Sequence, residues 1–102
     1  MSKMIRYVWI GANPSLTKFD SRLIRCLSQK NIVARWEYYQ NQDEPSSLQV
    51  ALTLLADYLK SLPNSVHLIG HGTGGLIGLL YARKYPEKVK SLTLLGIGDR
   101  PD

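Results

Sequence analysis

Hydrophobic and polar residues follow one another in blocks along the chain, and the blocks predict four strands and three helices. The strand-like blocks are short and rich in β-branched and aromatic residues. The helix-like blocks repeat apolar residues at spacings of three and four. The predicted strands are Ile5–Ile10, Ile32–Tyr38, Val66–Ile69 and Val89–Leu95. The predicted helices run from Thr17 to about Gln29, from about Glu44 to Leu62, and from Leu76 to Ala82.

Strands and helices alternate without exception, so the 102 residues are expected to form one α/β domain. This order predicts a four-stranded parallel sheet with flanking helices and right-handed crossovers. The first two helices each carry an apolar stripe that should pack on the sheet. Their members are Leu16, Phe19, Leu23 and Cys26 or Leu27, and then Leu48, Ala51, Leu52, Leu55, Leu59 and Leu62. Cys26 is therefore expected to be a small core residue.

A glycine-rich turn between the third strand and the third helix is the expected centre of any chemistry. Glycines stand at 70, 72, 74, 75 and 78, where they permit positive φ and close approach of the helix to the sheet. The helix that follows is apolar nearly all round, so it should be largely buried. Ligands of parallel sheets bind beyond the carboxyl ends of the strands, which makes Gly11–Pro14, Gly70–Gly75 and Gly96–Asp99 the candidate loops.

The segment Gly70-His71-Gly72-Thr73-Gly74-Gly75 resembles the nucleophile elbow of the α/β-hydrolase family, which has the pattern Gly-x-Ser-x-Gly. The likeness continues through the apolar helix, Tyr85-Pro86-Glu87-Lys88-Val89 and the last strand, and so covers essentially the whole chain. It implies a truncated version of the family's three-layer sandwich. In it the four strands correspond to the family's third to sixth, in the spatial order 2-1-3-4.

The position of the nucleophile in this resemblance is occupied by Gly72, which has no side chain to attack a carbonyl. The neighbouring hydroxyl of Thr73 is expected to point elsewhere. His67 and His71 are interpreted as structural residues, and Asp99 is only a weak candidate for the acid. The resemblance would place oxyanion-hole N–H donors at Thr73 and near Ala12.

A second hypothesis rests on the same glycines. Gly70-x-Gly72-x-x-Gly75 matches the dinucleotide-binding fingerprint, whose backbone N–H groups hold a pyrophosphate at a helix N-terminus. Under this hypothesis the ligand-binding residues are Gly70, His71, Gly72, Thr73, Gly74 and Gly75. The acidic residue that the fingerprint requires at the end of the next strand is not there, since Asp99 lies beyond it. A P-loop is excluded because no Gly-Lys-Ser/Thr follows.

The amino-acid composition limits the kinds of partner and cellular location that are expected. The net charge of +5 comes from scattered basic residues without a nucleic-acid motif, so no nucleic acid is expected. No apolar run approaches the ~20 residues of a membrane span, and no signal peptide is expected. The single cysteine, Cys26, fits a reducing cytoplasm. No metal site and no cofactor are expected.

The resulting hypothesis is an α/β-hydrolase-like protein without a working triad. It is either a non-catalytic miniature or the N-terminal fragment of an ester or acyl hydrolase, because the chain stops in a loop after a strand. The strand Val89–Leu95 should lie at a sheet edge with uncovered apolar residues, which predicts a homodimer or a partner chain there.

Overall fold

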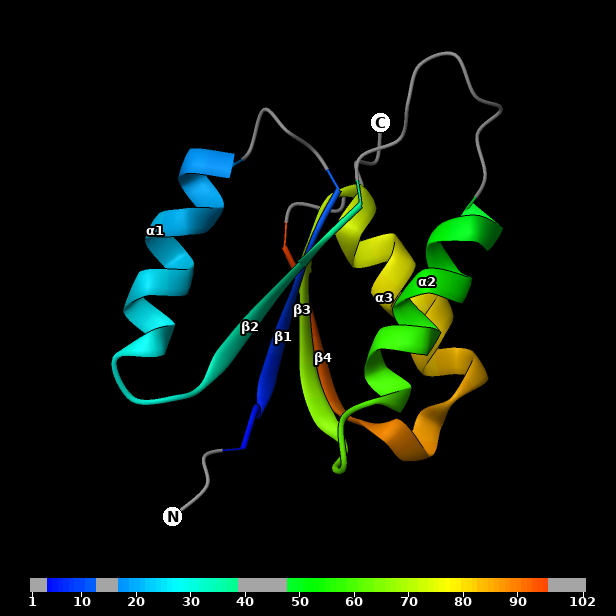
Figure 1. Cartoon of the computed structure of the whole chain (residues 1–102). Coiled ribbons are helices and arrows are strands. Elements are labelled where there is room, and N and C mark those ends of the chain that lie inside the picture. Colours follow the sequence, from blue (N-terminus) through cyan, green and yellow to red (C-terminus); the bar gives the residue numbers. More distant parts are fainter. Residues whose placement is uncertain (1–3, 13–16, 39–47, 96–102) are drawn as a thin grey trace.

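The computed structural model describes residues 4–12, 17–38 and 48–95. Four strands and three helices alternate along these residues, as predicted (Figure 1). The strands are β1 (Tyr7–Gly11), β2 (Val33–Glu37), β3 (Val66–His71) and β4 (Val89–Leu95). The helices are α1 (Thr17–Ser28), α2 (Leu48–Lys60) and α3 (Thr73–Lys84), and a 3-10 turn (Pro86–Lys88) leads into β4.

The four strands form one parallel sheet in the order β2-β1-β3-β4, which confirms the predicted order. In the register Tyr7 lies beside both Val33 and His67, and His67 lies beside Ser91. Within the described residues β2 and β4 are the edges, so the predicted edge position of Val89–Leu95 is correct.

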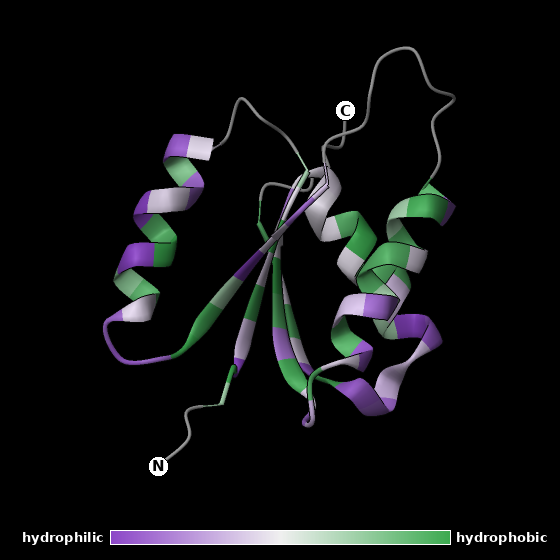
Figure 2. Cartoon of the chain, in the orientation of Figure 1, coloured by the Kyte–Doolittle hydropathy of each residue, from purple (hydrophilic) through white to green (hydrophobic). Residues whose placement is uncertain are grey.

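The two faces of the sheet are covered unequally. Helices α2 and α3 pack on one face, whereas α1 alone lies on the other (Figure 1). The α2/α3 face holds the buried core: Val8, Ile10, Ala51, Leu55, Leu59, Val66, Leu68, Ile77 and Tyr81. Helix α2 is hydrophobic along most of its length, while α1 alternates hydrophilic and hydrophobic bands (Figure 2).

The structure corrects several details of the sequence analysis. Cys26 is exposed and not in the core. Phe19 is 50% exposed although it belongs to the predicted stripe, because a single helix on that face does not enclose its own apolar side. Leu76 is 39% exposed on α3. The third helix begins at Thr73 instead of Leu76, and β3 runs to His71 instead of Ile69.

Candidate functional site at the end of strand β3

Strand β3 passes into helix α3 through one residue, Gly72. Its backbone has φ 61° and ψ −123°, and it is the only glycine with positive φ in the described part of the chain. The amide of Gly72 donates to Leu95 O (3.0 Å), and its carbonyl accepts from Leu76 N (3.1 Å). The turn is therefore tied both to β4 and to the first turn of α3.

Two flanking glycines are required by packing. A Cβ on Gly70 would lie 2.4 Å from backbone atoms of Gly75, and a Cβ on Gly74 would lie 2.2 Å from Ile10 O. Backbone thus touches backbone where α3 starts, which only glycine allows. The glycine-rich segment brings the helix N-terminus directly against β1 and β3.

Gly72 differs from these neighbours because the space above it is open. A Cβ built at this position meets no atom within 4 Å. The residue has the backbone geometry of a tight strand-to-helix elbow and room for a side chain, yet supplies only hydrogen. Thr73, the nearest hydroxyl, is exposed at the first position of α3.

Of the other predicted site residues, Ala12 lies close to the elbow. Its backbone nitrogen is 3.5 Å from the position that a Cβ on Gly74 would occupy. The loop after β1 and the first turn of α3 therefore meet. Asp99 lies outside the described residues.

His71 makes a contact that sequence reasoning missed. Its Nδ1 lies 3.1 Å from Oδ1 of Asp20, a carboxylate in the first turn of α1 that is only 2% exposed. The Phe19 ring lies 5.2 Å from the imidazole, centroid to centroid. The pair joins residues 51 positions apart. The only sequence signal at Asp20 is a pattern that resembles a helix capping box, and such a pattern does not indicate a histidine partner.

His67, at the other end of β3, has different neighbours. Its Nδ1 lies 2.6 Å from Ser91 Oγ, and its ring stacks on Tyr7 with centroids 4.7 Å apart. His67 and His71 are four residues apart on one strand, so both side chains lie on the α1 face.

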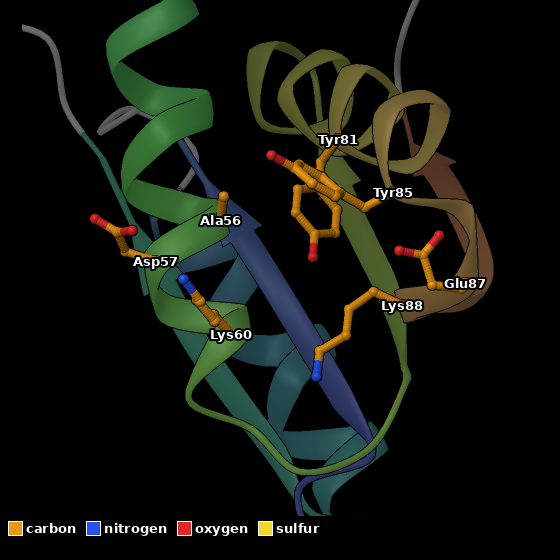
Figure 3. Close-up of a pocket in the computed structure, with 7 residues that line it drawn as sticks. All are labelled: Ala56, Asp57, Lys60, Tyr81, Tyr85, Glu87 and Lys88. Atoms are coloured by element: carbon orange, nitrogen blue, oxygen red, sulfur yellow. The ribbon is translucent and has the colours of Figure 1, made fainter.

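The described residues also line hollows outside the elbow itself. One, of about 310 Å³, is lined by Ala56, Asp57, Lys60, Tyr81, Tyr85, Glu87 and Lys88 (Figure 3). Burial raises the pKa of the Tyr81 hydroxyl above its usual value, and Tyr85 and Glu87 raise it further. This phenol therefore stays protonated at neutral pH.

The second hollow, of about 140 Å³, lies at the amino ends of the strands and includes His67. The third, of about 450 Å³, is a shallow apolar groove between α1 and the sheet. In the described ranges no cluster of three or more His, Cys, Asp or Glu side chains could hold a metal ion. No helix in those ranges is long and apolar enough to cross a membrane.

Comparison with known proteins identifies one matching family profile and several similar sequences. A profile described as "alpha/beta hydrolase fold" matches residues 59–102. An uncharacterised protein of Synechocystis sp. is 47% identical over 94 residues, which are 92% of this chain and 38% of that protein. An uncharacterised protein of Nostoc sp. is 43% identical over 101 residues, covering 99% of this chain and 40% of the relative.

A third relative has a named activity. It is the cis-3-alkyl-4-alkyloxetan-2-one decarboxylase of Shewanella oneidensis, 31% identical over 101 residues, which cover 89% of this chain and 32% of that enzyme. The chain thus spans about two fifths or less of the length of these relatives. Together with the strand order and the glycine elbow, these matches support an α/β-hydrolase fold for this chain.

Proposed function

We propose that this chain is a non-catalytic α/β-hydrolase-like protein, or the N-terminal part of one, that binds a ligand at its elbow without attacking it. The observation that carries the proposal is Gly72, which combines an elbow backbone with open space where a nucleophile would stand. Acyl transfer through a covalent intermediate requires a side-chain nucleophile at that point. A glycine there leaves binding as the remaining task.

Backbone N–H groups are the binding elements in this proposal. The amide of Thr73, at the first position of α3, has no partner within the helix, and the positive end of the helix dipole lies beside it. The amide of Ala12 comes from the adjacent loop. Two such donors are suited to a carbonyl or carboxylate oxygen.

The Asp20–His71 pair adds a polar group beside the elbow. A carboxylate that accepts a hydrogen bond from Nδ1–H leaves Nε2 able to accept a proton, as in the acid–base half of a triad. The pair lies on the α1 face, and no nucleophile accompanies it at position 72. In the proposal it positions α1 at the rim of the ligand site.

The experiment uses two variants of one position, Gly72→Ser and its control Gly72→Ala. The Cβ that both share meets no atom within 4 Å, and both carry the same strain of positive φ. The hydrolysis of p-nitrophenyl acetate by the unaltered chain and by both variants is expected to equal the buffer rate. Urea unfolding of each variant establishes that the protein measured is folded.

Two outcomes would contradict the proposal. Saturable hydrolysis by the unaltered chain would mean that another residue attacks the ester. Hydrolysis by Gly72→Ser but not by Gly72→Ala would mean that a working base is present and that only the nucleophile is missing.

The dinucleotide-binding alternative has no observation of its own in its favour. Gly70 is accounted for by its close approach to the backbone of Gly75, and Gly72 by its positive φ. These two glycines of the fingerprint therefore need no phosphate to explain them.

The second part of the proposal is a second copy or a partner chain at the edge strand β4 and the α1 face beside it. We also propose a cytoplasmic location. The apolar groove on the α1 face is lined by Trp9, Leu23, Ile69 and Leu95, among others. The indole N–H of Trp9 is buried without an acceptor in the described part of the chain. On the opposite, α2/α3 face of β4, Leu94 is 38% exposed. Pairing of β4 with a second copy or a partner chain would cover such surface. A monomer in sedimentation at high micromolar concentration would count against self-association.

A further inference from the structure

The hollow at the amino ends of the strands has a different chemistry from the elbow. Its lining includes Arg6, Asn64, Ser65, His67 and Lys90. Arg6 and Lys90 are cationic. The other three side chains are uncharged hydrogen-bonding groups when the imidazole of His67 is neutral. Among the described residues no carboxylate lines the hollow, and neither Arg6 nor Lys90 makes an ion pair within the described ranges.

The imidazole of His67 is held in place. Ser91 binds Nδ1 at 2.6 Å and the Tyr7 ring stacks against the imidazole plane. When the Ser91 hydroxyl donates to Nδ1, the ring proton stands on Nε2 and can be donated to a ligand. A fixed donor beside two unpaired cations is an arrangement that suits a compact anion.

We propose that this hollow, lined by Arg6, His67 and Lys90, is a binding site for a phosphate group. Its volume of about 140 Å³ has room for one tetrahedral anion with part of its hydration shell. Arg6 supplies a planar fork of donors, Lys90 a point charge, and His67 a single oriented N–H. The site is at the opposite end of β3 from the elbow, so it is independent of the proposed function.

The chain has two histidines, which makes the site directly observable. Inorganic phosphate is titrated into the isotope-labelled chain at constant ionic strength, with chloride as the replaced ion, and the imidazole signals are followed by NMR. The His67 signal is expected to move with saturation, while the His71 signal stays in place. This result would locate the anion at the amino end of β3.

Variants that each remove one positive charge test whether phosphate binds in the hollow or is attracted only by the net charge of the protein. Arg6→Gln and Lys90→Gln remove one cation each from the lining, and Arg83→Gln removes one from the exposed last turn of α3. Loss of a charged hydrogen bond should weaken phosphate binding at least about tenfold in Arg6→Gln. Binding by Arg83→Gln should stay within about twofold of the unaltered chain.

The proposal is overturned if no saturable shift of His67 occurs, or if Arg83→Gln weakens binding as much as Arg6→Gln. A shift confined to His71 and the amides of residues 72–75 would also overturn it and would instead support an anion at the elbow. Glycerol 3-phosphate and vesicles containing phosphatidic acid then separate the sources. Tighter binding of either one than of inorganic phosphate supports the site and identifies a free or a membrane-bound phosphate ester.

Discussion

Strand β3 carries a histidine at each end, on the same face of the sheet, and each imidazole has one oxygen partner. At the carboxyl end His71 meets the buried carboxylate of Asp20 at 3.1 Å. At the amino end His67 meets the exposed hydroxyl of Ser91 at 2.6 Å. The residue types are similar, but the surroundings are opposite in kind.

At the carboxyl end of β3 the main feature is close backbone packing, whereas at the amino end it is a group of cationic residues. Around His71 the glycines let α3 touch β1 and β3, and positions 70 and 74 have no space for a side chain. At the His67 end, Arg6 and Lys90 are among the residues that line an open hollow. The comparison shows that the chain has the tightly packed backbone of a nucleophile elbow but no side chain at position 72. The polar and cationic residues lie instead at the amino end of β3, where no such backbone packing is present in the described residues.

The largest expected effect comes from disrupting the backbone packing at the carboxyl end. Gly70→Ala would put a Cβ 2.4 Å from the backbone of Gly75. Overpacking against side chains costs about 1–3 kcal/mol and occasionally more, and backbone atoms yield less easily. We expect a loss of at least about 3 kcal/mol of unfolding free energy, or a melting temperature lower by roughly 12 °C or more.

Gly72→Ala is the matched control for this prediction. Its Cβ meets nothing within 4 Å, so the cost is only the backbone strain at φ 61° and ψ −123°, about 1–3 kcal/mol. Urea unfolding of both variants measures the difference. Equal destabilisation would mean that the close contact of Gly70 with Gly75 does not limit the packing of α3.

The alternation of strands and helices made the sheet predictable. Its order and its parallel pairing follow from the hydrophobic blocks and the resemblance together. The start of α3 was misplaced because Gly74 and Gly75 resemble turn residues in a sequence. In the structure they belong to the first helical turn, where Gly74 must be glycine because a Cβ there would meet the Ile10 carbonyl, and the Gly75 backbone lies against Gly70.

The contacts of the two histidines were not predictable in the same way. Asp20 and His71 are 51 positions apart, and their pairing depends on where α1 lies on the sheet. The periodic pattern of apolar residues shows which side of α1 faces the sheet, but not where on the sheet the helix lies. His67 and Ser91 meet through the β3–β4 register, which includes an irregularity at Val66/His67. The exposure of Cys26 and Phe19 was missed for a related reason, because a periodic stripe does not reveal how much of it is covered.

The smaller predicted effects compare the two histidine partners directly. Asp20→Ala removes a charged acceptor that is only 2% exposed, and we expect it to cost about 1.5–3 kcal/mol of unfolding free energy. Ser91→Ala removes an exposed hydroxyl, and water can take its place as the hydrogen-bond partner of the imidazole. We therefore expect a loss of only about 0.5 kcal/mol of unfolding free energy. Urea unfolding at pH 7 measures both, and NMR of the two imidazoles reports which ring moves. If Ser91→Ala cost as much as Asp20→Ala, the amino end of β3 would be as tightly built as the elbow, and the contrast between a packed end and a charged end would be wrong.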